Sequence, residues 1–296
     1  MMKNLKTLLL LLLVSGSANL TFAQQLNTPA PSPGSTLKQS VGLAEVTLEY
    51  SRPSAKGRVI FGDLVPYGEL WRTGANLATK FTVNKDLTFG SSTLKAGSYA
   101  ILTKPDKDEW TLNFYPYESS GFGAYLEKTP SVSVTAKSYS MPDDAMVETL
   151  IMDINNITGN SASIDIIWAN TYVSFPFTLA TDAEVMAQIN DLEKNTKSSM
   201  ANNYYAAASY LLGEKKELEK ALNYVNQAVE IRPEAFWMSR TQSQILAELG
   251  KYQEAVAAAN VSLAAAKAAK NDQYVKFNEA AIADWTPKIK SSSKKK

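Results

Sequence analysis

The chain has 296 residues, enough for one large or two ordinary domains, and its 30 basic residues nearly balance its 29 acidic ones. This balance gives no electrostatic reason to expect a nucleic acid or an anionic membrane as a partner. The lack of histidine and cysteine excludes Ser-His-Asp and Cys-His catalysis, His-ligated metal sites and thiol chemistry. Carboxylate, lysine, tyrosine and serine chemistry remain, with hard cations such as calcium as the one permitted class of metal. We expect no metal site and no cofactor.

The first residues are typical of a secretory signal. Lys3 and Lys6 precede an apolar run over residues 8–14, and the small-residue end Thr21-Phe22-Ala23 follows. The run is shorter than the roughly 20 residues that span a bilayer. We therefore predict a signal peptide over residues 1–23 and an exported protein, periplasmic or secreted, with no membrane span.

Residues 24–35 form a polar, proline-rich lead that we expect to be flexible. A β pattern then extends over residues 36–180, where Val46, Leu48 and Tyr50 alternate with polar residues, as in a strand with one buried face. Further strands are predicted over residues 80–83, 87–89, 98–103, 110–115, 131–139, 147–154, 163–168 and 172–178. Many short strands separated by turns predict an antiparallel β-sandwich or jelly roll, with a closed barrel as the alternative.

The stretch over residues 50–79 follows neither the strand period nor the helix period. It is rich in arginines, aromatic residues and turn formers. A long aperiodic connection inside a compact domain is usually functional or disordered, and a high aromatic content argues against disorder. We therefore predict an ordered loop.

Three arginines of this loop, Arg52, Arg58 and Arg72, need partners. Because a guanidinium group suits carboxylates and phosphates, one hypothesis is a binding site for a small anion or a saccharide. Trp71 or Tyr67 would then supply a flat apolar wall. Asn76 would be a further donor, although a turn residue is the more common role of asparagine at such a position.

The structural alternative, which we favour, keeps these arginines inside the loop. Arg58 and Arg72 would pair with Asp63 and Glu69 or bind loop carbonyls. For an enzyme, Glu69 with Asp63 as its partner is a weak candidate for the carboxylate pair of a glycan hydrolase or lyase. A salt bridge is the commoner role of such residues.

Three sequence blocks carry a resemblance to a known family: SRPSAKGRVIFGDLVPYGELWRTGAN at residues 51–76, KAGSYAI at 95–101 and DEWTLNF at 108–114. Over residues 31–179 the chain resembles an uncharacterised family of exported bacterial proteins, domain of unknown function 2911. The resemblance implies a β-rich domain behind a signal peptide. It implies no activity, and the later part of the chain lies outside it.

From Thr181 onwards the pattern is helical. Thr181 and Glu184 fit a capping box that opens a helix extending to about Lys197. The segments ALNYVNQAVEI and AVAAANVSLAA are similar, and their first residues, Ala221 and Ala255, lie 34 positions apart, the tetratricopeptide period. Two helix pairs over residues 199–270 therefore resemble tetratricopeptide repeats, with helices 182–197 and 272–286 as caps. We predict a tetratricopeptide-like domain over residues 181–290 and a disordered basic tail over 291–296.

Tetratricopeptide-like pairs stack into a curved surface whose groove usually holds a peptide or another protein. Five aromatic residues are predicted either to line such a groove or to pack between helices: Tyr204, Tyr205, Tyr210, Tyr224 and Trp237. The leading hypothesis is an exported non-enzymatic binding protein, with protein contacts through the helices and a small anionic or saccharide ligand in the β domain. The alternatives are a carboxylate-dependent glycan hydrolase or lyase, and a purely structural envelope scaffold.

Overall fold

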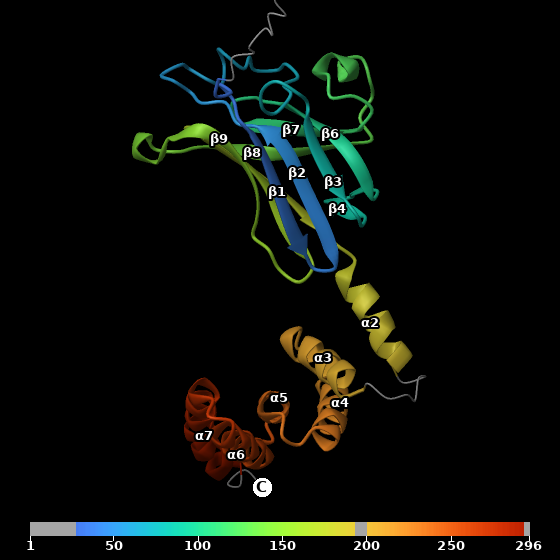
Figure 1. Cartoon of the computed structure of the whole chain (residues 1–296), viewed down its shortest axis with the longest axis vertical. Helices are drawn as coiled ribbons and strands as arrows, with labels where there is room; N and C mark the ends of the chain where they lie inside the picture. The colour runs from blue at the N-terminus through green and yellow to red at the C-terminus, as the bar shows by residue number, and fades with distance from the viewer. Residues whose placement is uncertain (1–27, 193–199, 293–296) are drawn as a thin grey trace, which may run out of the picture. The chain divides into compact units, whose positions relative to one another are not determined.

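The computed structural model describes residues 28–192 and 200–292. The predicted signal peptide, the first part of the lead and the last four residues of the tail lie outside the described residues. The chain divides into two compact units, Met1–Thr181 and Asp182–Lys296, called here the β unit and the helical unit (Figure 1). The predicted order of a β-rich part followed by a helical part is confirmed.

The described part of the β unit contains eleven strands, and every pairing between them is antiparallel. The strands are β1 (Gly34–Val41), β2 (Ala44–Ser51), β3 (Thr79–Val83), β4 (Leu87–Phe89), β5 (Ser92–Leu94), β6 (Gly97–Lys104), β7 (Glu109–Pro116), β8 (Val132–Ser140), β9 (Val147–Asn155), β10 (Ser161–Ala169) and β11 (Thr171–Thr178). Strand β1 begins at Gly34, so the end of the predicted flexible lead belongs to the sheet. Strands β1 and β5 were not predicted.

The strands follow the order β1-β2-β3-β6-β7-β8-β11-β10-β9, with the β4-β5 hairpin beside β11. Strand β8 joins two layers, because Val132 to Lys137 pair with β7 whereas Ser138 to Ser140 pair with β11. The result is a sandwich-like sheet that is nearly closed on itself. This confirms the predicted antiparallel sandwich and gives it a partly barrel-like form.

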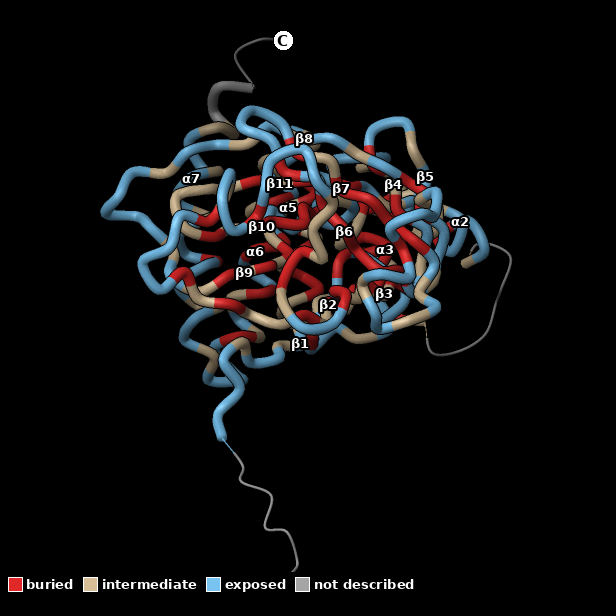
Figure 2. The backbone as a smooth tube through the Cα atoms, turned by 90° about the horizontal axis from the view of Figure 1, so that it is seen from above, coloured by how far each residue is buried: buried red, intermediate tan, exposed pale blue. Residues whose placement is uncertain are grey.

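The core lies between the two layers. Val46 and Leu48, predicted from the alternation in β2, are fully buried, and Trp110 and Trp168 are buried as well. Figure 2 shows long buried stretches, in red, along β6 and β7. Burial of aromatic side chains of this size supplies much of the hydrophobic stabilisation of such a unit.

Tyr50 in β2 and Arg52, just after β2, supply hydrogen-bond partners for backbone groups at the outer edge of β9. The Tyr50 hydroxyl donates to the Met152 carbonyl at 3.0 Å and accepts from the Met152 N–H at 2.9 Å. Arg52 Nε donates to the Leu150 carbonyl at 2.8 Å. A buried strand edge needs such partners because unpaired backbone groups are costly away from water.

Backbone bonds complete this closure. The Leu150 N–H donates to the Pro53 carbonyl at 2.9 Å, and the Ala55 N–H donates to the Glu148 carbonyl at 2.7 Å. We call Tyr50–Ala55 the clasp. It links the end of β2 to β9 without a regular strand, and it is the first part of the loop singled out in the sequence.

The described part of the helical unit contains six helices, α2 (Thr181–Leu192, starting at the unit boundary), α3 (Met200–Gly213), α4 (Leu218–Ile231), α5 (Phe236–Glu248), α6 (Tyr252–Ala268) and α7 (Asp272–Ser292). The predicted tail therefore begins with two helical residues. Two short 3₁₀ helices lie in the β unit, η1 (Phe122–Tyr125) and η2 (Asp143–Ala145). None of the described helices combines the length and the apolar character needed to cross a membrane.

The internal repeat corresponds to equivalent buried positions in α4 and α6. Two sets of residues 34 positions apart are all fully buried: Ala221, Val225 and Ala228 on α4, and Ala255, Ala259 and Ser262 on α6. Small side chains at these positions allow neighbouring helices to approach closely. The helix pairs α3–α4 and α5–α6 are therefore tetratricopeptide-like, and α5 also contacts both α3 and α7.

Within the helical unit, polar contacts join the start of α2 to α3 and to the turn after α3. Lys216 Nζ and the Tyr210 hydroxyl both donate to the Asp182 carboxylate, at 2.7 and 3.0 Å, and these bonds lower the pKa of Asp182. Burial and the bond to Asp182 raise the pKa of Tyr210 to about 12. The predicted capping box is wrong, because the buried Thr181 hydroxyl makes no hydrogen bond. The end of the predicted helix, beyond Leu192, lies outside the described residues.

Candidate functional site

The loop between β2 and β3 is ordered by its own contacts. It lies at the same end of the sheets as the segment after β7 that carries η1 (Figure 1). The Trp71 N–H and carbonyl pair with those of Thr103 at the end of β6, at 2.7 and 2.9 Å. The predicted loop is therefore an extension of the β unit rather than a separate segment.

All three arginines bind carbonyl oxygens, and for two of them these are the main contacts. Arg52 belongs to the clasp, as described above. Arg58 Nε donates to the Ala55 carbonyl at 2.9 Å, and its Nη2 donates to the Ser54 carbonyl at 2.7 Å. Both arginines therefore hold backbone groups of the loop and of β9.

The third arginine, Arg72, has a different environment. Its Nη1 donates to the Asn76 carbonyl at 2.8 Å, and its guanidinium carbon lies 4.9 Å from the centre of the Phe122 ring in η1. The Asn76 side chain donates to the Ser32 carbonyl and the Ser51 hydroxyl, at 3.1 and 3.2 Å. Asn76 has a positive φ of 58° and occupies a turn.

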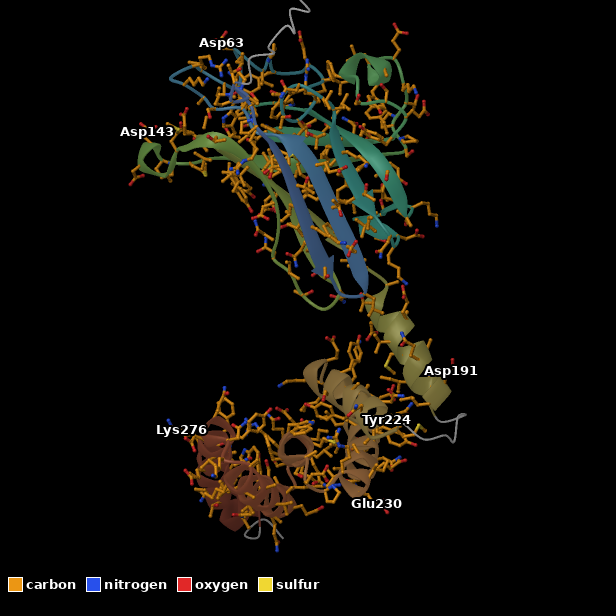
Figure 3. The ribbon with its side chains drawn as sticks, in the orientation of Figure 1. Asp63, Asp143, Asp191, Tyr224, Glu230 and Lys276 are labelled. Carbon is orange, nitrogen blue, oxygen red and sulfur yellow. The ribbon has the colours of Figure 1, made fainter. Side chains whose placement is uncertain are left out.

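The two carboxylates of the loop are exposed, and neither pairs with an arginine among the described residues. Figure 3 labels Asp63 at the loop end of the β unit. The structural alternative gave two possible kinds of partner for Arg58 and Arg72, the loop carboxylates or the loop carbonyls. In the structure, both arginines bind carbonyls. The predicted pairing of Arg58 and Arg72 with Asp63 and Glu69 is not formed.

Trp71 is partly buried in an aromatic cluster. Its ring stacks on Trp168, with centres 5.9 Å apart and planes 17° apart. Phe61 contacts the same cluster edge-on, with its ring centre 4.7 Å from that of Trp110 and 5.9 Å from that of Trp71. Trp71 Nε1 donates to the Gly74 carbonyl at 3.1 Å. One face of the Trp71 ring, which was predicted to form a wall for a ligand, is thus part of the core.

Tyr67 covers a glycine of the same loop. Gly62 has a positive φ of 92°, and a Cβ at this position would lie 2.6 Å from the Tyr67 ring. Only glycine combines this backbone conformation with so close an approach. The Tyr67 ring therefore has an intramolecular contact, although the residue is 37% exposed.

A hollow of about 170 Å³ lies beside Arg72, lined by Leu64, Val65, Pro66, Glu69, Leu70, Trp71, Arg72 and Phe122. It brings together Glu69, Trp71 and Arg72 of the predicted site residues. Asp63, Tyr67, Asn76 and the other two arginines do not line it. Phe122 was not predicted as a site residue, because the sequence Gly121-Phe122-Gly123 is typical of a flexible loop.

Residues 32–177 match a family model described as a protein of unknown function, DUF2911. This region of the chain belongs to the DUF2911 family. The DUF2911 match covers almost all of the described β unit and stops before α2. No match to the chain was found among the curated proteins or among the solved structures.

Outside the DUF2911 region, the helical unit has a second hollow of about 490 Å³. It is lined by Leu212 on α3, Gln244, Ala247 and Glu248 on α5, Tyr252 on α6, and Asp284, Trp285 and Lys288 on α7. Lys288 Nζ lies 2.8 Å from an Asp284 carboxylate oxygen and 5.5 Å from the centre of the Tyr252 ring. This hollow combines an aromatic wall with charges of both signs.

The aromatic residues singled out in the helical sequence do not line this hollow. Tyr224 is buried among the helices (Figure 3), and its hydroxyl donates to the Ile189 carbonyl at 3.2 Å. Tyr204 stacks on Tyr224 with ring centres 5.8 Å apart, and Tyr210 binds Asp182. Tyr204 and Tyr224 therefore serve mainly to pack helices together, whereas Tyr210 also lines another hollow, between α2 and α3.

Proposed function

We propose that the protein is an exported, non-enzymatic binding protein whose helical unit receives a segment of a partner protein. The observation that carries the proposal is the hollow of about 490 Å³ between α3, α5 and α7. Most of its lining comes from alternate helices of a tetratricopeptide-like stack, with Tyr252 added by α6. Alternate helices form the binding groove in such repeats.

The chemistry of this hollow suits a polypeptide. Trp285 is partly buried and offers an apolar surface, while Gln244 offers both a hydrogen-bond donor and an acceptor. Glu248 and Asp284 are exposed carboxylates. A segment with alternating apolar and polar side chains can use all of these groups, as ligand sites usually combine apolar walls with a few polar groups.

A photo-crosslinking residue in place of Gln244 tests the proposal in cells. We expect protein adducts at position 244 that are missing when the same residue replaces Gln253, an exposed position of α6 outside the hollow. We also expect the adducts to be lost when Glu248→Lys is added, because this change reverses a charge of the hollow. Equal labelling at the two positions would contradict a role of the hollow in partner binding.

A second candidate is a small anion or saccharide in the hollow of the β unit. Its support is Arg72, which contributes one hydrogen bond to the loop through Nη1 and lines a space of about 170 Å³ next to Trp71. With glucuronate as the probe, calorimetry is expected to detect binding that Arg72→Gln abolishes. Lys56→Gln is the control, because Lys56 is exposed and does not line the hollow. If Arg72→Gln binds glucuronate as the parent does, this candidate fails.

The carboxylate-dependent glycan hydrolase or lyase receives less support. Glu69 is the one carboxylate that lines this hollow, and Asp63 does not contribute to it. A two-carboxylate mechanism needs both groups on opposite sides of the bond that is cleaved. A purely structural scaffold would give negative results in both experiments above.

A further inference from the structure

Arg240 on α5 is partly buried, and a buried nitrogen of its guanidinium group lacks a hydrogen-bond partner. Its side chain makes no hydrogen bond or ion pair with the described residues, and its Nη1 atom is buried. Desolvation by burial lowers its pKa. An N–H group that is shielded from water without an acceptor is unfavourable, so the retention of arginine at this position needs a reason.

The surroundings of Arg240 are aromatic. Its guanidinium carbon lies 4.8 Å from the centre of the Phe277 ring on α7, and Phe277 is 43% exposed. One turn earlier on both helices, Phe236 packs on Tyr274 with ring centres 4.8 Å apart. The aromatic ring fixes the guanidinium plane but offers no acceptor to its N–H groups, and the buried Nη1 has no acceptor among the described residues.

A second arginine of the helical unit provides a comparison. Arg232 also lies over an aromatic ring, 5.4 Å from the centre of Trp237. Its Nη1, however, donates to the Asn202 side chain at 3.1 Å, and its Nε lies 3.6 Å from a Glu234 carboxylate oxygen. Similar stacking therefore occurs at Arg232 with protein partners for the guanidinium group, and at Arg240 with none among the described residues.

Arg240 is also well placed for a partner of the helical unit. It precedes Gln244 by one helical turn on α5 and so lies on the same side of that helix. Gln244 lines the hollow of the proposed function. A segment in that hollow that continues along α5 by one turn reaches Arg240 and Phe277.

Building on the proposed function, in which the helical unit receives a protein segment, we infer that Arg240 and Phe277 bind an acidic residue of that segment together with an adjacent apolar side chain. A carboxylate accepts two parallel N–H bonds from a guanidinium group and supplies the missing negative charge. The exposed Phe277 ring receives the neighbouring apolar side chain. A free inorganic anion would satisfy the charge but would leave Phe277 exposed.

NMR titration tests this inference without knowledge of the natural partner. The chain has five arginines, so an Nε–H spectrum contains few signals, and the signal missing in Arg240→Gln identifies Arg240. The probes are N-acetyl-Asp-Phe-amide and its neutral analogue N-acetyl-Asn-Phe-amide. We expect the Arg240 signal to shift with the acidic probe and to remain in place with the neutral one.

The variants give the quantitative part of the test. Arg240→Gln is expected to weaken binding of the acidic probe at least about tenfold, the factor that corresponds to one charge-assisted hydrogen bond. Phe277→Ala should also weaken it, whereas Arg232→Gln, the matched control, should not. Arg240→Gln removes an uncompensated charge, so the helical unit is expected to stay folded, which circular dichroism checks.

Equal shifts with the two probes, or unchanged binding by Arg240→Gln, would overturn the inference. The test is separate from that of the proposed function. A binding response at Arg240 with no adducts at position 244 would reject the hollow as the partner site and keep the acidic site. Adducts at position 244 with no response to the acidic probe would reject the binding of an acidic residue at Arg240 and keep the hollow as the partner site.

Discussion

Replacing Tyr50 with phenylalanine is expected to lower the free energy of unfolding of the β unit by roughly 2–4 kcal/mol. The change removes one hydroxyl group and leaves the Met152 N–H and carbonyl without their partner. Each buried group left unsatisfied costs about 1–3 kcal/mol, and the phenylalanine ring fills almost the same space. Urea denaturation of the full chain, followed by the β-sheet signal in circular dichroism, measures the loss.

Tyr139→Phe is the control for this experiment. Tyr139 is 54% exposed, and removal of its hydroxyl is expected to change the free energy by less than about 0.5 kcal/mol. If Tyr50→Phe behaves like Tyr139→Phe, the clasp does not stabilise the β unit in the way its hydrogen bonds indicate.

Trp71→Ala is expected to destabilise the β unit by about 3 kcal/mol, near the lower end of the range for truncation of a large core aromatic residue. The ring would be lost from its stack on Trp168 and its edge contacts with Phe61 and Trp110. Its partial burial is the reason for the lower end of the range. The same urea denaturation measures the effect.

Leu77→Ala provides the comparison within the same loop, because Leu77 is 58% exposed and its truncation should have little effect. A small effect of Trp71→Ala, similar to that of Leu77→Ala, would show that the cluster does not depend on this ring. Trp71 would then be a surface residue, open to a ligand on both faces. A large effect agrees with one face of the ring belonging to the core.

The strands were largely predictable because their two faces differ. Alternation in β2 identified Val46 and Leu48 as core residues, and both are fully buried. Strand β1 was missed because its sequence GSTLKQSV is mostly polar, and its even-numbered positions are exposed up to Ser40. Strand β5 has three residues, too few for a period to be visible.

The loop was predictable in its order but not in its contacts. Composition identified the arginines as residues in need of partners. It did not reveal that Arg52 binds the carbonyl of Leu150, 98 positions later, because every residue has a carbonyl and none is marked in the sequence. Phe122 was missed for a similar reason, since its contact with Arg72 depends on the meeting of two distant loops.

In the helical unit, the small residues carried more information than the aromatic ones. Ala221 and Ala255 identified the repeat correctly, because only small side chains fit where helices approach closely. Tyr224 was weighed as a groove residue but is buried between helices. A buried tyrosine and a groove tyrosine have the same helical spacing, so periodicity does not distinguish them.

The clasp also has a consequence for the order in which the β unit folds. Tyr50 and Met152 are 102 positions apart. By contrast, β1 and β2 form one hairpin and β6 and β7 form another, and both hairpins form through local contacts. The entropy of closing so long a segment has to be overcome before the distant contact contributes. During synthesis from the N-terminus, the first layer can pair while Tyr50 and Arg52 still lack their partners. Joining the clasp to β9 is therefore a late step, and a nascent chain shorter than about 150 residues exposes the polar groups that later close the unit.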